Sequence, residues 1–117
     1  MAIKLSVVIP AYNEEKNLKR DVLGEVDEYL KTVDYEYEVL IVDDGSKDST
    51  REIVKQQIKD KKGFCLIENL HGGKANTVIT GLLKAEGEIA LFTDMDQATP
   101  LSEIEKFLPK FEAGADV

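Results

Sequence analysis

Four short apolar runs divide the chain at intervals, and each is nearly continuous in apolar side chains. They occupy residues 5–9, 39–42, 64–67 and 89–92. A strand with one solvated face alternates apolar and polar positions, whereas a parallel strand covered on both faces does not. The runs therefore predict four strands of a parallel sheet that lies between two layers of helices.

Helical patterns lie between these runs. In residues 18–33, Leu18, Val22, Val26, Leu30 and Val33 recur every three or four positions. Residues 75–83 fit the template of an amphipathic helix, with the apolar set Ala75, Val78, Ile79, Leu82 and Leu83. Both segments are predicted to be helices that place one apolar face against the sheet.

Capping boxes mark the start of two more helices, with Ser49 paired to Glu52 and Ser102 to Glu105. Strands and helices then alternate strictly, which implies right-handed crossovers and an α/β fold with a doubly wound, mostly parallel, Rossmann-like sheet. With no linker or repeat, residues 1–117 are predicted to form a single domain. Residues 113–117 look like a helix exit followed by the start of a fifth strand, so we expect the domain to be truncated on its C-terminal side.

Composition limits the possible partners. The net charge of −8 argues against nucleic acid and against an anionic membrane surface, because both are bound through an excess of lysine and arginine. An acidic chain that handles an anionic substrate needs a local basic group or a bridging cation. The single cysteine, Cys65, excludes an internal disulfide and is expected to be a buried, inert thiol. No run reaches the ~18 apolar residues of a membrane span, so a cytoplasmic location is expected.

Polar segments follow all four predicted strands. They are residues 10–14, 43–50, 69–74 and 94–97, and three of them contain acids. Ligands of open parallel sheets bind at the carboxyl ends of the strands. The sequence therefore predicts a ligand site where these segments meet.

Asp94 and Asp96 are spaced so that both carboxylates point to one side of an extended chain. Hard oxygen ligands of this kind suit Mg²⁺ or Mn²⁺, which take one or two protein carboxylates together with substrate phosphates. A cation would let an acidic pocket hold a diphosphate. The alternative is a solvated turn in which the two acids cap a helix.

The pair Asp43 and Asp44 begins a sequence, Asp-Asp-Gly-Ser, that is good turn chemistry by itself. The functional interpretation is that one aspartate accepts hydrogen bonds from a base N–H or a ribose hydroxyl. Tyr12 could cover a base with its ring, or could simply pack at the strand end.

Gly72, Gly73 and Lys74 open the predicted helix 75–83. Backbone N–H groups at a helix start, together with one lysine, suit a phosphate group. The segment is not a P-loop, because the upstream glycine and the Ser or Thr after the lysine are missing. His71, the single histidine, is interpreted as a loop residue rather than a catalytic one.

Together, the segments 10–14, 43–50, 72–76 and 94–96 resemble, in order and spacing, family 2 glycosyltransferases of the GT-A fold. The resemblance covers almost the whole chain and implies strand order 3-2-1-4. Residues 92–100 are most similar to the branch that glucosylates dolichyl or polyprenyl phosphate. Met95 departs from the alanine usual between the two acids, and its side chain is expected to point away from the metal.

The resemblance implies a role for each motif. Pro10, Tyr12 and Glu14 would line the base and ribose pocket, and Asp44 with Asp43 beside it would hold the uracil or ribose. Lys74 would lie near the nucleotide or sugar. Asp94 would reach the ribose or a Mn²⁺ or Mg²⁺ ion, and Asp96 would be the main metal ligand.

The implied reaction transfers a sugar, with UDP-glucose as the expected donor, to a polyprenyl or dolichyl phosphate or to a saccharide. It is a single displacement with inversion. The acid or base residue and the acceptor site would come from a following half, so no catalytic residue is assigned within residues 1–117, and the chain alone is expected to be inactive.

Two alternatives belong to other classes. A non-catalytic nucleotide and metal-binding module would share these motifs, and the missing half would distinguish the two. A phosphoreceiver domain carries its acid pair after the first strand, where this chain has residues 10–14, so that class is disfavoured. Residues 89–93 are expected to form an apolar sheet edge that promotes self-association.

Overall fold

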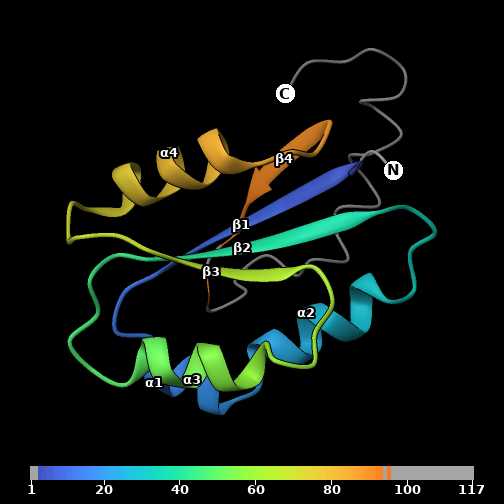
Figure 1. Cartoon of the computed structure of the whole chain (residues 1–117). Coiled ribbons are helices and arrows are strands. Elements are labelled where there is room, and N and C mark those ends of the chain that lie inside the picture. The colour runs from blue at the N-terminus through green and yellow to red at the C-terminus, as the bar shows by residue number, and fades with distance from the viewer. Residues whose placement is uncertain (1–2, 94, 96–117) are drawn as a thin grey trace.

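The computed structural model describes residues 3–93 and residue 95, which form one sheet with helices on both sides (Figure 1). The elements in chain order are β1 (Leu5–Ala11), α1 (Glu15–Lys19), α2 (Val22–Leu30), β2 (Tyr37–Asp43), α3 (Thr50–Gln57), β3 (Phe64–Glu68), α4 (Lys74–Lys84) and β4 (Ile89–Phe92). The helix and strand predicted beyond residue 96 lie outside the described residues. No described helix has the length and apolar character needed to cross a bilayer.

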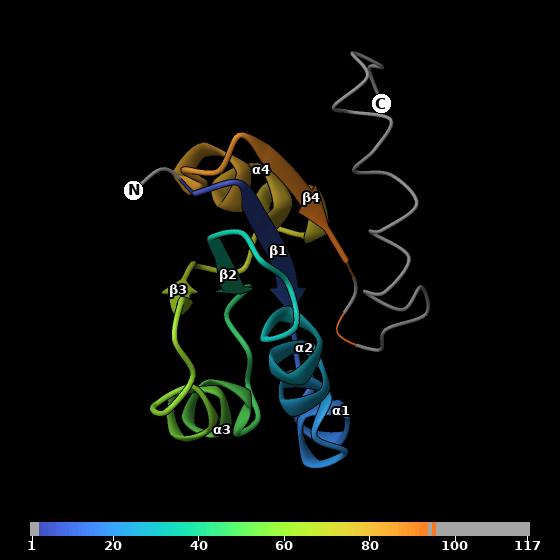
Figure 2. The ribbon, with the colours of Figure 1, turned by 90° about the vertical axis from the view of Figure 1, so that its right-hand side faces the viewer.

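The four strands are all parallel and their order is β3-β2-β1-β4, as predicted. Helices α1, α2 and α3 lie on one side of the sheet and α4 lies on the other (Figure 2). The doubly wound α/β arrangement is thus confirmed for the described part of the chain. It places the loops that follow β1, β2 and β3 at the carboxyl edge of the sheet, where the ligand site was predicted.

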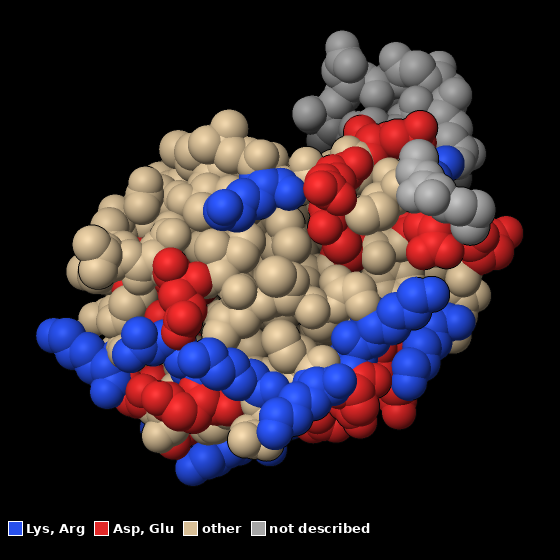
Figure 3. All heavy atoms as spheres, in the orientation of Figure 1, with Lys and Arg blue, Asp and Glu red and all other residues tan. Residues whose placement is uncertain are grey.

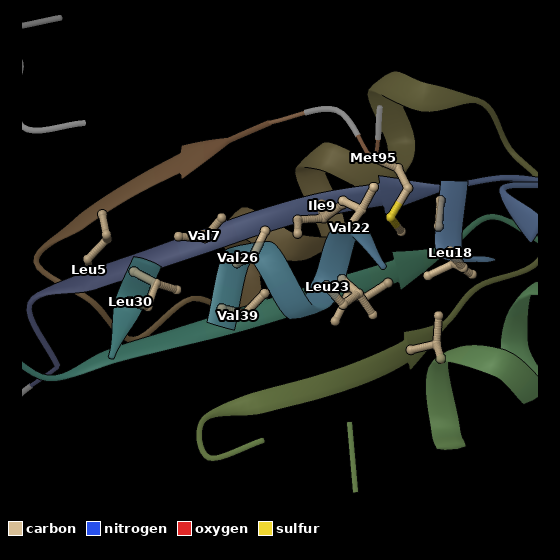
Figure 4. Close-up of a cluster of buried hydrophobic side chains, with 13 residues drawn as sticks. Leu5, Val7, Ile9, Leu18, Val22, Leu23, Val26, Leu30, Val39 and Met95 are labelled. Atoms are coloured by element: carbon tan, nitrogen blue, oxygen red, sulfur yellow. The ribbon is translucent and has the colours of Figure 1, made fainter. Parts of the chain in front are cut away.

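The main hydrophobic core lies between the sheet and helices α1 to α3 (Figure 4). Its strand residues alternate, as Leu5, Val7 and Ile9 do in β1, and α2 contributes Leu23. Met95 is fully buried in the same cluster, so its side chain points into the core.

The segment 18–33 is not one continuous helix. It is divided into α1 and α2 at Asp21, whose φ of 60° lies in the left-handed region. Leu18 and Leu30 are nevertheless both buried, because the break leaves the apolar residues on the side that faces the sheet. The predicted capping box at Ser49 is wrong: the Ser49 side chain makes no cap hydrogen bond, and Asp48 Oδ1 accepts from the Thr50 N–H at 2.9 Å instead.

Helix α4 forms where predicted but packs through a different face. Its buried residues are Thr77 and Gly81, whereas Ile79, Leu82 and Leu83 are exposed. A Cβ added at Gly81 would lie 2.3 Å from Val8 Cγ1. The helix therefore approaches the sheet at its smallest residue, and larger apolar side chains of the predicted face are left outside the contact.

All four strands were predicted to be covered on both faces, and this prediction is wrong for the edge strands β3 and β4. β1 is buried along its whole length, but β3 and β4 have only half-buried and exposed positions. Cys65, expected to be buried, is exposed. Cys65 lies on the α4 side of edge strand β3, and the main contacts of α4 with the sheet are to β1, β2 and β4.

Candidate functional site

A cavity of about 250 Å³ opens at the carboxyl ends of the strands, on the side of the sheet that α4 covers. Its lining consists of Pro10, Ala11, Tyr12, Glu14, Asp44, His71, Gly73, Lys74 and Thr77. Pockets for whole drug-sized ligands are about 300–1,000 Å³, so this volume suits one part of a larger ligand. Five residues selected from the sequence (Pro10, Tyr12, Glu14, Asp44 and Lys74) line the same cavity.

The loop after β1 is tied to the loop after β2. Asn13 has a φ of 53°, and its N–H donates to Ser46 Oγ at 3.0 Å. Asn13 Oδ1 accepts from the Lys47 N–H at 2.8 Å, and the Glu14 N–H donates to Thr50 Oγ1 at 2.8 Å. An asparagine tolerates the left-handed conformation better than most residues. These bonds set the direction in which Tyr12 and Glu14 leave the sheet.

Asp43 and Asp44 have opposite surroundings, because successive residues at a strand end point to opposite faces. Asp43 is fully buried on the side of α3 and serves its own turn. Its Oδ2 accepts from the N–H groups of Gly45 and Ser46, each at 3.0 Å, and its Oδ1 accepts from Ser46 Oγ. The Asp43 carboxylate does not line the cavity, and a ligand contact for it stays a prediction.

Asp44 points toward the start of α4 and binds the third loop of the site. Its Oδ1 accepts from the Gly72 N–H at 2.8 Å, and its Oδ2 accepts from the Gly73 N–H at 3.1 Å. Two backbone donors that were predicted to meet a phosphate are therefore occupied by Asp44. Its side chain is only 6% exposed, so these bonds are strong and fix the loop before α4.

Glycine is required where this loop meets the Asp-Asp-Gly-Ser turn. Gly45 has a φ of 78°, and a Cβ there would lie 2.9 Å from the backbone nitrogen of His71. Gly73, with a φ of 97°, is the residue before α4. Both backbones adopt conformations that side-chain-bearing residues rarely take, and the approach at Gly45 brings His71 to the cavity wall.

Tyr12 and His71 form a stacked pair, with ring centroids 4.6 Å apart and ring planes at 29°. His71 was not selected as a site residue, yet it lines the cavity. The signal available in the sequence was its place directly before Gly72 and Gly73, in the same loop as Lys74.

The cavity is lined by charges of both signs. Glu14 and Asp44 contribute carboxylates, and Lys74 contributes the ammonium group among the described lining residues.

Asp48 lies outside the cavity lining. Burial raises the pKa of Asp48, but hydrogen bonds from Thr50 and Glu15 outweigh the effect of burial and hold that pKa below its ordinary value. Asp48 thus joins the first and second loops as a carboxylate.

The predicted metal ligands Asp94 and Asp96 lie outside the described residues. Within residues 3–93 and 95, no group of three or more His, Cys, Asp or Glu side chains could hold a metal ion. The Thr93 N–H donates to Val8 O at 3.0 Å, so the chain leaves β4 next to β1 before it reaches position 94. The donor types at 94 and 96 suit Mg²⁺ or Mn²⁺.

A parallel α/β sheet of this order, with a cavity at its strand ends, defines the class as Rossmann-like ligand-binding proteins. Residues 6–117 match the model of glycosyl transferase family 2, and the chain belongs to this family.

Similar curated proteins are transferases named for polyprenyl phosphates. An undecaprenyl-phosphate 4-deoxy-4-formamido-L-arabinose transferase from Proteus mirabilis is 34% identical over 116 residues, covering 97% of this chain and 35% of the relative. A dolichyl-phosphate beta-glucosyltransferase, ALG5A, from Trichomonas vaginalis is 38% identical over 110 residues, covering 89% and 34%. The chain thus spans about a third of the length of these relatives.

Solved structures give the same fold. The first 349 residues of S. aureus TarS, in complex with UDP-GlcNAc, superpose with a TM-score of 0.73 at 29% identity, covering 94% of this chain and 32% of that one. The mannosyltransferase PcManGT from Pyrobaculum calidifontis, in complex with GDP-Man and Mn²⁺, superposes with a TM-score of 0.71 at 29% identity, covering 88% and 30%. Both belong to the GT-A type of fold expected from the sequence.

Proposed function

We propose that this chain is the donor-binding part of a glycosyltransferase that transfers a sugar from a nucleoside diphosphate to a polyprenyl phosphate. The observation that carries the proposal is the meeting of Pro10, Tyr12, Glu14, Asp44 and Lys74 around one cavity. They come from three segments far apart in the sequence. Relatives named as undecaprenyl-phosphate and dolichyl-phosphate transferases support the acceptor class.

The proposed donor is UDP-glucose. Its support is the likeness to a dolichyl-phosphate beta-glucosyltransferase and to a structure solved with UDP-GlcNAc. The similar structure solved with GDP-Man makes the choice of base an experimental question.

The described residues would bind and orient this donor. Tyr12 offers a ring face to the base, and Glu14 offers carboxylate oxygens to ribose hydroxyls. Lys74, at the first residue of α4, places a positive charge on the side where the diphosphate would lie. Asp44 acts indirectly, because its hydrogen bonds to Gly72 and Gly73 fix the loop that leads to Lys74.

Asp94 and Asp96 would hold a Mn²⁺ or Mg²⁺ ion, which when bound stabilises the negative charge of the departing nucleoside diphosphate. A phosphate acceptor is already largely anionic, since the second pKa of a phosphomonoester is about 6. Positioning of donor and acceptor would then dominate the rate of a single displacement with inversion.

The remaining parts of the activity are assigned to sequence outside this chain. The acceptor site and any acid or base residue belong there, so residues 1–117 alone are proposed to be inactive in transfer and to act at the cytoplasmic side of a membrane. The similar proteins are named as transferases, which gives a non-catalytic module no specific support.

The test is calorimetric titration of the chain with UDP and GDP, each with Mn²⁺ and with EDTA. We expect UDP to bind more tightly than GDP and only with the metal present. Lys74→Ala should weaken UDP binding by about tenfold or more, since it removes a charge-assisted contact to phosphate. Lys84→Ala, in the last turn of the same helix, is the matched control and should leave binding unchanged.

Asp96→Asn should abolish the metal-dependent part of UDP binding while the thermal unfolding midpoint stays the same. Equal affinity for UDP in EDTA and in Mn²⁺ would contradict the proposed role of the metal ion. A chain that binds neither nucleotide would contradict the proposed function as a whole.

A further inference from the structure

Thr77 lines the cavity from helix α4 and has no role in the donor site described above. The residue is fully buried, and it lines the cavity together with Gly73 and Lys74. We propose that Thr77 is a positioning residue, whose hydroxyl group sets the conformation of the first turn of α4 and, through it, the direction of the Lys74 ammonium group. This inference rests on the proposed function, in which Lys74 contacts the diphosphate, and adds to it a residue that orients Lys74.

The place of Thr77 follows from the close contact of α4 with the sheet. Thr77 and Gly81 are the buried residues of this helix, and they lie one turn apart on the same face. Gly81 brings the helix against Val8 of β1, where a Cβ would lie 2.3 Å from Val8 Cγ1. Thr77 therefore lies between the helix and the sheet, and its hydroxyl group must find a hydrogen-bond partner within the protein.

The hydroxyl group finds that partner in the first turn of α4. Thr77 Oγ1 lies 2.6 Å from the backbone oxygen of Lys74 and 3.4 Å from that of Gly73, so the Lys74 oxygen is the main acceptor. The Thr77 N–H also donates to the Gly73 oxygen, at 3.2 Å. The amide and the hydroxyl group of one buried residue thus bind the two residues with which α4 enters the cavity wall.

Packing alone does not explain a hydroxyl group at this position. A valine has nearly the same shape and would fill the same space without a polar atom that needs a partner. A threonine that bonds back to a carbonyl three or four residues earlier often bends its helix, and here the bond is made in the turn that begins with Lys74. The hydroxyl group therefore acts on the direction of that turn.

The chain contains a second bond of the same kind, away from the cavity. Thr32 Oγ1 donates to the backbone oxygen of Tyr29, also at 2.6 Å and also across three residues. It follows helix α2, on the other side of the sheet from α4 (Figure 2). Thr32 therefore offers a control in which the same bond is removed far from Lys74.

The first test is titration calorimetry with UDP in the presence of Mn²⁺. Thr77→Val removes the hydroxyl group and keeps the shape, and it should weaken UDP binding by roughly three- to tenfold, as expected for the loss of one hydrogen bond. Thr77→Ser keeps the hydroxyl group and should bind UDP like the original chain. Thr32→Val, the matched control, should also leave the affinity unchanged.

The thermal unfolding midpoint separates positioning from simple packing. Thr77→Ser removes a buried methyl group and should lower the midpoint more than Thr77→Val, which keeps the apolar contacts. The variant that loses more stability should therefore keep its affinity for UDP, and the variant that loses less should bind UDP more weakly. If affinity and stability fall in the same order, Thr77 has only a packing role and the inference is overturned.

The second test asks whether Thr77 acts through Lys74. In a chain that already carries Lys74→Ala, the further change Thr77→Val should leave UDP affinity unchanged, because the charge that the hydroxyl group orients is gone. An equal loss of affinity with and without Lys74 would show that the effect has another route and would overturn the inference.

The outcomes separate the two proposals. If the original chain binds UDP and Thr77→Val binds it equally well, the role of Thr77 is overturned and the proposed function stands. If the original chain does not bind UDP at all, the proposed function is overturned and this inference with it.

Discussion

The two faces of the sheet differ in how completely they are covered. On the side of α1, α2 and α3, one continuous cluster of buried apolar residues joins strands and helices. On the side of α4, the buried cluster is limited to Val8, Leu40 and Val42. The cavity lies on this second, more thinly covered side, so the domain separates the face that stabilises it from the face that carries the ligand site.

The surface shows the same division. In Figure 3 the charged side chains gather mainly over the lower part of the view, in the region of α1, α2 and α3, whereas the region of α4 carries few. Exposed apolar residues on this face are Ile79, Leu82, Leu83 and Phe92. A solvated helix face would carry charged residues, so the α4 side has the composition of a surface that another element covers.

The largest expected effect comes from truncating the same residue type on the two faces. Leu23→Ala in α2 removes a fully buried side chain and should lower the free energy of unfolding by about 2–5 kcal/mol. Leu83→Ala in α4, where the residue is 81% exposed, should change it by less than about 0.5 kcal/mol. Urea unfolding of both variants measures this, and equal losses would refute the comparison.

The approach of α4 to the sheet gives the next largest effect. Gly81→Val places a side chain where even a Cβ would meet Val8 at 2.3 Å, so the helix must move, at a cost of about 1–3 kcal/mol. UDP binding should fall as well, because Lys74 moves with the helix. Ala75→Val adds bulk to an exposed position of the same helix and serves as the control, and thermal unfolding with titration calorimetry distinguishes them.

The apolar face of α4 and the β4 edge are proposed to promote self-association. We expect light scattering at tens of micromolar to give a mass above that of one chain. Replacing both Ile79 and Leu83 by Glu should return the mass to that of a monomer. Replacing Gln56 and Thr32 by Glu adds the same charge on the other face, and this control should leave the mass above that of one chain. A monomeric original chain would contradict the proposal.

The smallest effect concerns Asp48, which joins the loops after β1 and β2. Because hydrogen bonds depress its pKa in the folded chain, it stabilises the fold above the pKa of an unfolded aspartate. This contribution is lost as the pH falls through the lower folded pKa. Asp48→Asn should thus cost less than about 1 kcal/mol at neutral pH and nothing in acid, and urea unfolding across pH measures the difference.

The central strands and the site were predictable because their sequence signals are local and strong. β1 and the second half of β2 are buried on both faces, and this produces the continuous apolar runs that marked them. Loops that follow parallel strands meet at one edge of the sheet, which is sufficient to bring Tyr12, Asp44 and Lys74 together.

Other features depend on contacts between distant segments. The exposure of Cys65 follows from the position of β3 at an edge of the sheet, away from the main contacts of α4, and the order of strands was needed to predict it. The buried face of α4 is set by the close contact of Gly81 with Val8. The periodicity of apolar residues does not predict this contact, because glycine has no side chain. His71 was missed for the same reason, since its contacts to Tyr12 and Asp44 join three loops.

The exposed thiol of Cys65 has a practical consequence for solution work. In air-oxidised buffer, two chains can be joined by a disulfide between their β3 edges, and such a species would have the mass of a non-covalent dimer. Association should therefore be measured in the presence of a reductant and with Cys65→Ser. The same thiol, single in the chain and absent from the cavity lining, accepts a maleimide fluorophore, which labels the chain at one position outside the site.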